Sequence, residues 1–372
     1  MLVPLMNATF MAETHAGTAG VDNAKRAARA LPRDQFRLVS RGGVASSGRV
    51  PLIDKPLPEL FEYAGRNPRP PDFDAYWAAG LADLDATNPR VELQPNATAA
   101  PRHIECFDLW FDGVGGARIY AKYLRPKTRV TASRLPAVLQ FHGYSGHSGD
   151  WFDKFGWPAE GFCYAAMDCR GQGGRSQDNV PVRGTTLRGH IVRGLDDPDP
   201  RKLAFRQIFL DAVQLARVVM SLDEVDAARV GCFGASQGGA LTLACAALEP
   251  RIRRAAPVFP FLCDYQRVWE LDFAKDAYEE LRLFFRSFDP RHERVKEIFT
   301  KLGYIDCQHL AARIRAEVLM FTGLMDTICP PSSQFAAYNK IASKKDIVIY
   351  PDFTHETLPG QIDRTFNFMR GL

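Results

Sequence analysis

Apolar residues in the second half of the chain fall into short continuous runs, separated by longer stretches with helical spacing. Short apolar runs bounded by turn residues predict buried strands, and apolar positions that recur every three or four residues predict helices. The runs predict strands at 137–142, 162–168, 229–235, 254–259, 318–322 and 346–350. Because helical stretches separate them, the sequence predicts an α/β fold, a mostly parallel sheet with helices on both faces.

The part of the chain that precedes these strands has a different pattern. Residues 57–63 predict a short amphipathic turn, and alternating stretches at 103–111 and 117–124 predict a pair of strands that lead into the sheet. Residues 72–84 predict a helix that Asp72 caps. The apolar face of this helix consists of Phe73, Tyr76, Trp77 and Leu81.

An aromatic and charged segment, about residues 263–315, interrupts the alternation of strands and helices. Such spacing is more typical of accessory helices packed on the body of a domain than of an exposed binding surface, and we favour packing. The large apolar residues of this helical insertion are Tyr265, Trp269, Phe273, Tyr278, Leu281, Phe284 and Phe285.

Charge is distributed unevenly over the 372 residues. The net charge is +4, and residues 1–55 alone contain eight Lys/Arg against four Asp/Glu, so the rest of the chain is balanced and offers no basic face for a nucleic acid. The Gly/Ala/Arg-rich composition of residues 1–55 predicts a disordered N-terminal extension, with a transit peptide as the alternative. Residues 56–372 then form the catalytic domain.

The eight cysteines are scattered, without a Cys-x-x-Cys pair or the His/Cys spacing of a zinc site. Cys232 and Cys245 lie in apolar surroundings and are predicted to be buried thiols in a reducing compartment, which favours a cytoplasmic location. Neither a membrane-spanning apolar stretch nor a basic segment typical of a signal peptide is found, so no membrane association is expected.

The stretch around Ser236 carries the strongest chemical signal. An apolar run with strand character passes through Gly234-Ala235-Ser236-Gln237-Gly238 into an apparent helix. A Gly-x-Ser-x-Gly turn between a strand and a helix is the context of a nucleophile elbow, which exposes the serine hydroxyl. Side chains at the two glycine positions would collide with the neighbouring elements. An incidental serine in a glycine-rich turn is the alternative for this motif taken alone.

Three further loops follow predicted strands. In the first, Gly143 and Tyr144 come after the strand at 137–142, where this kind of fold supplies an oxyanion N–H group; His142 is expected to brace the loop by hydrogen bonds. Asp326 and His355 follow the next-to-last and last strands. The order Ser236, Asp326, His355 is that of a catalytic triad in α/β-hydrolases, with His355 as the base and Asp326 as its partner.

Together these motifs resemble carbohydrate esterase family 7, the acetyl xylan esterases and cephalosporin-C deacetylases of the α/β-hydrolase superfamily. The resemblance extends from about Leu57 to the C-terminus. It rests on Gly65-Arg66-Asn67-Pro68, Phe73-Asp74-Ala75-Tyr76-Trp77, Arg170-Gly171-Gln172, Thr186-Leu187-Arg188-Gly189, Gly234-Ala235-Ser236-Gln237-Gly238-Gly239, Pro260-Phe261-Leu262-Cys263, Gly323-Leu324-Met325-Asp326 and His355-Glu356.

The resemblance implies a role for each matched residue. It implies the triad Ser236, Asp326 and His355, and an oxyanion hole made by the backbone N–H groups of Tyr144 and Gln237. It also implies supporting roles for Arg170, Gln172 and Glu356, an acyl pocket walled by Tyr144, Pro260 and Ile328, no metal or other cofactor, and a hexameric homo-oligomer. The chain departs from the pattern at Thr357-Leu358-Pro359, where glycines are expected, and in its long N-terminal segment.

The sequence therefore predicts a serine carboxylesterase that removes small acyl groups, chiefly acetyl, from oxygen on xylo-oligosaccharides, cephalosporin C or similar compounds. Two alternatives remain: a peptidase of the prolyl-oligopeptidase type, which is disfavoured because no propeller-sized segment precedes the catalytic part, and a non-catalytic binding protein with a hydrolase fold. Retention of every triad residue argues against the second alternative.

Overall fold

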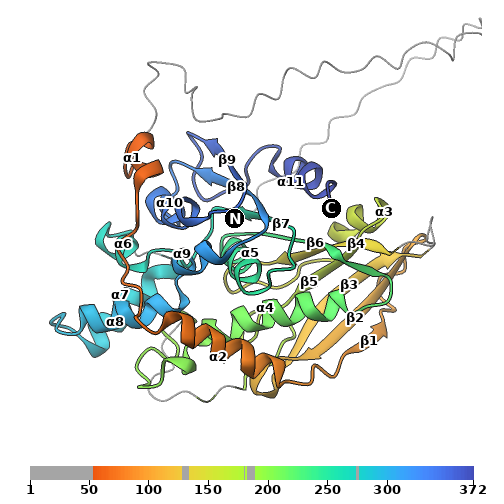
Figure 1. Cartoon of the computed structure of the whole chain (residues 1–372), viewed down its shortest axis with the longest axis horizontal. Coiled ribbons are helices and arrows are strands. Elements are labelled where there is room, and N and C mark those ends of the chain that lie inside the picture. The colour runs from red at the N-terminus through yellow and green to blue at the C-terminus, as the bar shows by residue number, and fades with distance from the viewer. Residues whose placement is uncertain (1–52, 128–133, 180, 182–188, 274–275) are drawn as a thin grey trace, which may run out of the picture. The chain divides into compact units, whose positions relative to one another are not determined.

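The computed structural model describes residues 53–127, 134–179, 181, 189–273 and 276–372 (Figure 1). They belong to one compact unit that spans residues 50–372. The predicted N-terminal extension lies outside the described residues except for its last three, and of the motif at 186–189 only Gly189 is described.

A central nine-stranded sheet organises the described residues, with the strand order β1-β2-β3-β5-β4-β6-β7-β8-β9. The pairs β1/β2, β2/β3 and β3/β5 are antiparallel, and all pairs from β5/β4 to β8/β9 are parallel. The predicted strands are all present in a mostly parallel sheet, and the short polar β1 is an addition to them. The strands are β1 (Glu92–Pro95), β2 (Ile104–Asp112), β3 (Arg118–Pro126), β4 (Leu135–Phe141), β5 (Cys163–Met167), β6 (Val225–Ala235), β7 (Arg254–Val258), β8 (Glu317–Gly323) and β9 (Lys345–Tyr350).

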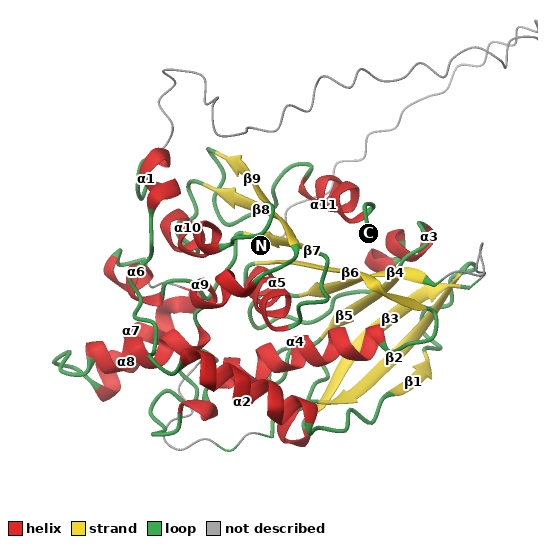
Figure 2. Ribbon diagram, viewed as in Figure 1, coloured by secondary structure: helices red, strands yellow, loops and turns green. Residues whose placement is uncertain are grey.

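Helices cover both faces of this sheet (Figure 2). On one face α4 and α5 pack against the strands and α2 lies against α4, whereas α3 and α11 pack on the other face. The α-helices are α1 (Leu57–Glu62), α2 (Phe73–Asp85), α3 (Gly156–Ala159), α4 (Ala204–Met220), α5 (Gln237–Leu248), α6 (Tyr265–Glu270), α7 (Glu279–Phe288), α8 (Val295–Leu302), α9 (Cys307–Leu310), α10 (Pro331–Lys340) and α11 (Gln361–Met369). Single 3₁₀ turns are η2 (Val114–Gly116), η3 (Phe152–Lys154), η4 (Pro200–Lys202), η5 (Asp276–Tyr278), η6 (Gly303–Ile305) and η7 (Ala311–Arg313).

The apolar core lies in layers on the two faces of the sheet. Side chains alternate along each strand, because successive Cβ atoms point to opposite faces. In β4, Leu139 belongs to the larger layer with α4 and α5, and its neighbour Val138 belongs to the smaller layer near α3 and α11. Cys232 and Phe233 in β6 alternate in the same way. The central strands are therefore buried on both faces, as their continuous apolar runs predict.

Helix α2 forms where it was expected, but its start is held differently. Asp72 makes no side-chain hydrogen bond to the helix N-terminus. Its carboxylate instead accepts a hydrogen bond of 2.5 Å from the hydroxyl of Tyr304. Asp72 therefore occupies the N-cap position as predicted, but its side chain does not cap the helix. Trp77 is fully buried and donates to the carbonyl oxygen of Tyr304 at 2.9 Å. Leu81 is only half-buried.

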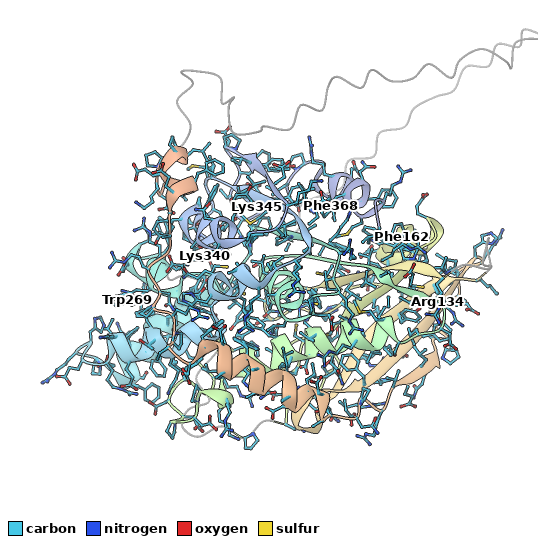
Figure 3. The ribbon with its side chains drawn as sticks, in the orientation of Figure 1. Arg134, Phe162, Trp269, Lys340, Lys345 and Phe368 are labelled. Atoms are coloured by element: carbon cyan, nitrogen blue, oxygen red, sulfur yellow. The ribbon has the colours of Figure 1, made fainter. Side chains whose placement is uncertain are left out.

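The helical insertion packs its aromatic residues inward. Tyr265, Tyr278 and Phe284 are fully buried, which confirms packing over an exposed aromatic surface for these side chains. The half-buried Trp269, labelled in Figure 3, packs within the insertion, tilted against two rings whose centroids lie 5.2 Å (Phe285) and 5.5 Å (Phe299) away.

Two buried carboxylates connect the insertion to the segment that precedes α2. Asp264 accepts hydrogen bonds from the Tyr63 hydroxyl at 2.8 Å and from the backbone N–H groups of Arg66 at 3.0 Å and Asn67 at 2.7 Å. The backbone N–H of Asp264 donates in turn to both carboxylate oxygens of Asp306 at 3.0 Å. Both aspartates are fully buried, so these bonds tie segments about 200 residues apart within the core.

All eight cysteines are buried free thiols, including Cys232 and Cys245 as predicted. A hydrogen bond with Cys232 and burial raise the pKa of the Cys245 thiol, which keeps it protonated. Across the described ranges, no helix combines the length and the apolar character that crossing a bilayer requires.

Candidate active site

Ser236 stands at the sharp turn between β6 and α5. Its backbone adopts φ 58° and ψ −118°, a conformation that non-glycine residues rarely adopt and that the surrounding structure must hold in place. The Ser236 N–H donates to the carbonyl oxygen of Val258 at 3.0 Å, and its own carbonyl oxygen accepts from the N–H of Phe261 at 3.1 Å. These two bonds fix the turn to β7 and to the loop after it.

The glycines on either side of Ser236 are required by close packing. A Cβ atom on Gly234 would lie 2.5 Å from the carbonyl oxygen of Phe141, and one on Gly238 would collide with that same oxygen. The end of β4 therefore presses against both sides of the turn. The steric reason inferred from the sequence for a Gly-x-Ser-x-Gly turn matches this packing.

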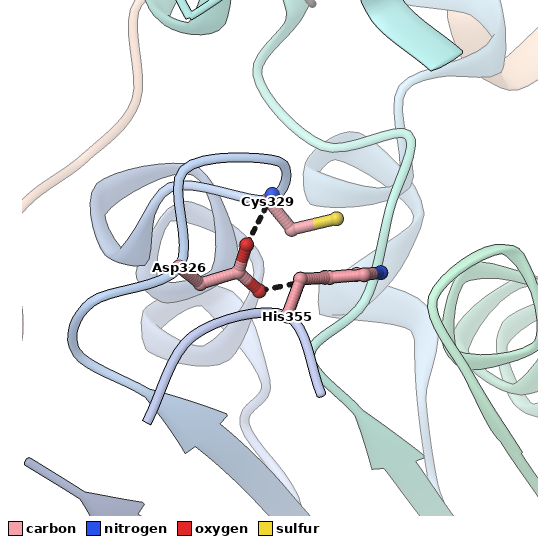
Figure 4. Close-up of side chains that lie close together, drawn as sticks. All are labelled: Asp326, Cys329 and His355. Carbon is pink, nitrogen blue, oxygen red and sulfur yellow. Dashed lines mark hydrogen bonds and ion pairs between the residues drawn. The ribbon is translucent and has the colours of Figure 1, made fainter. Parts of the chain in front are cut away.

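Asp326 and His355 form a hydrogen-bonded pair on the loops that follow β8 and β9 (Figure 4). Asp326 is fully buried, and its Oδ2 atom lies 2.8 Å from Nδ1 of His355. Its Oδ1 atom accepts the backbone N–H groups of Ile328 at 2.9 Å and Cys329 at 2.8 Å. These bonds orient the carboxylate, and in Figure 4 the other ring nitrogen of His355 points away from it. The His355 ring packs on Phe259, with centroids 4.4 Å apart.

The thiol of Cys329 lies close to this pair and forms a hydrogen bond with the Ser236 side chain, a contact that the sequence does not reveal. Burial is the main cause that raises the pKa of the Cys329 thiol, and the charge of Asp326 adds to it, whereas a hydrogen bond with the Ser236 side chain lowers it. Through this contact the structure brings Ser236 into the same cluster as Asp326 and His355. The only sequence signal for it was its position three residues after Asp326.

Donor atoms of Asp326, Cys329 and His355 lie within 4.8 Å of one another, a spacing that a metal ion could bridge. The carboxylate of Asp326 is already occupied by the His355 ring and by two backbone N–H groups. A raised pKa keeps the thiol of Cys329 protonated, whereas a metal ligand must be a thiolate. The hydrogen bonds of this cluster fit a polarised histidine better than a metal site.

Gln172 joins Gln237, the first residue of α5, to the loop that contains Tyr144. Gln237 and Tyr144 are the two residues expected to supply oxyanion N–H groups. Gln237 is the first residue of α5, so its N–H is one of the helix-terminal groups without an intrahelical acceptor. The Gln172 Oε1 atom accepts from the backbone N–H of Ser145 at 2.9 Å and from Nε2 of Gln237 at 3.0 Å. Gln172 also donates to Oε1 of Gln237 at 2.8 Å. The predicted support of the elbow by Gln172 is consistent with these contacts.

His142 braces the loop before Tyr144, as predicted. Its Nδ1 atom lies 2.7 Å from the carbonyl oxygen of Gly143, and its Nε2 atom accepts from the backbone N–H of Cys169 at 2.9 Å. Burial lowers the pKa of His142, which favours the neutral ring that these two bonds require.

Arg170 contributes to the fold next to the site without contacting the serine turn. Its guanidinium donates two hydrogen bonds of 2.6 Å to the carboxylate of Asp211 on α4 and weaker ones to the carbonyl oxygen of Val114. The side chains of Arg170 and Asp211 are 2% and 0% exposed, so this is a buried ion pair. Arg170 therefore supports the surroundings of the site by fastening the loop after β5 to α4.

The remaining predicted residues differ in burial. Glu356 is exposed and folds back on its own loop, where it accepts from the N–H of Thr354 at 3.0 Å and from its hydroxyl at 2.8 Å. Pro260 is buried next to Phe259, and Ile328 is half-buried beside Cys329. Leu358, which stands where glycines were expected, is buried and anchors the histidine loop in the smaller core layer.

Comparison with known proteins identifies the family of this chain. A profile of the family described as acetyl xylan esterase (AXE1) matches residues 50–372. The crystal structure of acetyl xylan esterase 1 from Thermoanaerobacterium sp. JW/SL YS485 is 56% identical with a TM-score of 0.83, and the match covers 85% of this chain and 98% of that one. An acetyl xylan esterase from Paenibacillus sp. R4 is 34% identical with a TM-score of 0.81, and the match covers 85% of this chain and 99% of that one.

A curated relative, acetyl esterase Axe7A of Xylanibacter ruminicola, is 27% identical over 311 residues. That alignment covers 81% of this chain and 66% of the relative, so the chain spans about two thirds of the relative's length. The family profile and the two solved structures extend over nearly all of the described residues. The chain therefore belongs to the acetyl xylan esterase family, carbohydrate esterase family 7, has the α/β-hydrolase fold and is a carboxylic ester hydrolase.

Proposed function

We propose that this protein is a serine deacetylase that hydrolyses small O-acyl esters, chiefly acetyl esters, of xylo-oligosaccharides, cephalosporin C or similar compounds. In this proposal Ser236, His355 and Asp326 form the catalytic triad. The observation that carries the proposal is the 2.8 Å hydrogen bond between His355 and a fully buried Asp326, next to a serine on a strained strand-to-helix turn. This is the constellation that activates a serine hydroxyl for acyl transfer.

Acylation begins when the Oγ atom of Ser236 attacks the ester carbonyl carbon and His355 Nε2 accepts the hydroxyl proton. Asp326 holds the other ring nitrogen and stabilises the imidazolium that forms. The negative charge that develops on the carbonyl oxygen is stabilised by the backbone N–H groups of Tyr144 and Gln237. When the tetrahedral intermediate collapses, His355 donates its proton to the leaving alcohol, and the acyl group remains on Ser236.

Deacylation repeats these steps with water as the nucleophile. His355 accepts a proton from the water molecule that attacks the acyl-enzyme, and the same two N–H groups stabilise the second tetrahedral intermediate. Collapse returns the proton to Ser236 and releases acetate. Each step is a proton transfer or an acyl transfer on groups of this chain, so the proposed cycle needs no cofactor.

The experiment that tests the proposal is the hydrolysis of 4-nitrophenyl acetate by the Ser236→Ala variant. Loss of the nucleophile should lower kcat by about 10⁴-fold or more and leave the melting temperature near that of the wild type. The Ser287→Ala variant, which removes an exposed serine of α7, is the matched control and should keep full activity. Substantial turnover by a pure Ser236→Ala preparation would contradict the mechanism.

Substrate choice is tested by measuring acetate release from acetylated xylo-oligosaccharides and from cephalosporin C under the same conditions. The names of the similar esterases support the first class, whereas the second comes from the resemblance of the motifs. A kcat/KM at least tenfold higher for one compound would assign the preferred leaving group.

We also propose a homo-oligomer, hexameric by family resemblance, in a reducing compartment such as the cytoplasm. Eight buried free thiols support the reducing compartment. Light scattering tests the assembly, and a single monomer peak at micromolar concentration would contradict it.

A further inference from the structure

Glu280 of helix α7 is a buried acid that the proposed mechanism does not use. Glu280 is only 4% exposed, although it lies in the helical insertion and not in the sheet. Its Oε1 atom accepts a hydrogen bond from the hydroxyl of Tyr144, and its Oε2 atom accepts the backbone N–H of Val192 at 2.9 Å. Both oxygens of one carboxylate therefore hold loops that come from different parts of the chain.

Tyr144 is held on its other side as well. Its hydroxyl oxygen accepts the backbone N–H of His190 at 2.6 Å while the hydroxyl proton is donated to Glu280. Burial and the neighbouring carboxylate both raise the pKa of the Tyr144 phenol, so it remains a proton donor at all working pH values. Edge-on contact with Phe261, at a centroid distance of 5.5 Å, further restricts the ring.

The backbone at Gly189 passes close to the Glu280 carboxylate. A Cβ atom on Gly189, whose φ is +115°, would collide with the carboxylate itself. Gly189 therefore allows the chain before His190 to pass directly over Glu280. The carboxylate, the tyrosine ring and the loop at 189–192 form one packed unit, which we call the Glu280 clamp.

We propose that Glu280 is a positioning residue for ester hydrolysis, which fixes the Tyr144 side chain and thereby the Tyr144 backbone N–H in the oxyanion hole. The inference rests on the proposed function, because it assigns that N–H to the oxyanion. It gives the insertion a catalytic purpose that its aromatic packing does not reveal. A donor displaced by about 1 Å can cost about 100-fold in rate, so fixing one loop has a large effect.

The protonation state of Glu280 should alter the clamp. Burial, the largest cause, raises the pKa of Glu280 to about 7, against the opposing hydrogen bonds from Tyr144 and the backbone. The groups that face it are the Tyr144 phenol from the loop after β4 and the backbone N–H groups of His190, Ile191 and Val192. The His190 ring packs edge-on against the Tyr144 ring. As an anion, Glu280 accepts on both oxygens. When protonated, one of its two oxygens carries a proton, so the two bonds can no longer both be strong.

The test compares Glu280→Gln with Tyr144→Phe, and with Glu279→Gln as the matched control from the exposed side of α7. An amide can accept on one atom only, and phenylalanine removes the hydroxyl, so each variant breaks one part of the clamp. We expect both to lower kcat for 4-nitrophenyl acetate by about 10- to 100-fold, with KM changed less than about threefold. The double variant should be no slower than the slower single variant, because both changes act through one unit.

The pH profile separates positioning from mere stability. The acid limb of wild-type kcat should contain an ionisation of Glu280, and the Glu280→Gln profile should lack it. The inference would be overturned if Glu280→Gln and Tyr144→Phe had the same kcat as the wild type, whether or not their melting temperatures were lower. If Ser236→Ala is inactive, such a result removes the role of Glu280 alone; if Ser236→Ala is active, the proposed function itself fails.

Discussion

The Nδ1 atom of His355 lies 2.8 Å from Oδ2 of Asp326, whose other carboxylate oxygen accepts two backbone N–H groups. Because two N–H groups donate to Oδ1, only an oxygen atom can occupy the Oδ1 position. An asparagine at residue 326 must therefore turn its NH₂ group toward His355, and the histidine is forced to place its proton on Nε2. In that tautomer the ring cannot accept the proton of Ser236.

The Asp326→Asn variant should consequently lose about 10⁴-fold in kcat while its melting temperature changes little. Steady-state hydrolysis of 4-nitrophenyl acetate measures the loss. Asp352→Asn, an exposed change close to His355 in sequence, is the matched control and should behave as the wild type. Activity of Asp326→Asn within tenfold of wild type would show that the pair does not set the tautomer.

The Arg170→Ala variant should be strongly destabilised. Removing the guanidinium leaves the fully buried Asp211 without its partner, which costs about 3–5 kcal/mol in the free energy of unfolding. Denaturant unfolding measures the loss. The double variant Arg170→Met/Asp211→Leu should regain most of the stability because no charge remains buried. If Arg170→Ala unfolds like the wild type, the ion pair has no structural importance.

Stability should depend on pH through Asp306. Burial, together with the nearby charge of Asp264, raises the pKa of Asp306 to about 7 in the folded protein, from 3.8. Between these values the unfolded chain releases the proton and the folded protein keeps it. The contribution of Asp306 to stability is therefore full below about pH 4, decreases as the pH rises to about 7 and is lost above it. Each pKa unit corresponds to about 1.4 kcal/mol.

Denaturant unfolding between pH 4 and pH 8 checks this, with Asp306→Asn as the variant that cannot ionise. The free energy of unfolding of the wild type should fall relative to Asp306→Asn as the pH rises. The difference between wild type and the exposed Asp352→Asn should stay constant. Parallel curves for wild type and Asp306→Asn would contradict a raised pKa at this site.

Native protein should resist alkylation by iodoacetamide at pH 7.5, although Cys329 contacts Ser236. Burial raises the pKa of the Cys329 thiol, and the thiolate is the reactive form. Mass spectrometry should find no modified cysteine in the native protein and eight modified cysteines after unfolding, because all eight are buried free thiols. Rapid inactivation by iodoacetamide would show that Cys329 is exposed or ionised.

Activity should fall from acetyl to butyryl to octanoyl esters of one leaving group. The walls proposed for the acyl pocket are rigid: Pro260 has a fixed backbone, and the β-branched Ile328 has few rotamers. Overfilling such a pocket costs typically about 1–3 kcal/mol and displaces the carbonyl carbon from Ser236. Ile328→Ala should flatten the decline in kcat/KM, and a wild-type preference for octanoyl esters would rule out a closed pocket.

The sequence predicted the sheet and the order of the site loops well, because buried strands and glycine-rich turns have strong local signals. Gly234 and Gly238 are needed by a contact with β4 that any such elbow makes. Polar contacts between distant segments were not predictable. Asp72 has the residue type and position of a helix cap, yet Tyr304 binds its carboxylate, and no local pattern contains that contact.

The roles of Cys329 and Glu280 were missed for the same reason. Each is an ordinary residue in its own segment, and its importance comes from a neighbour far away in sequence: Ser236 for Cys329 and Tyr144 for Glu280. The resemblance implied a supporting role for Arg170, but its partner Asp211 lies in a helix that offered no chemical motif. Local sequence motifs thus located the site, whereas hydrogen bonds between distant segments determine which residues surround it.

The hydrogen bonds between Asp264 and residues 63–67 also affect the order in which the chain folds during synthesis. Synthesis proceeds from the N-terminus, so the backbone N–H groups of Arg66 and Asn67 leave the ribosome about 200 residues before the carboxylate that will accept them. Until then water must hydrate these donors, and the segment before α2 has no partner. The insertion therefore packs against residues 63–67 only late in synthesis. In a nascent chain that stops short of residue 264, residues 63–67 should remain accessible to proteases.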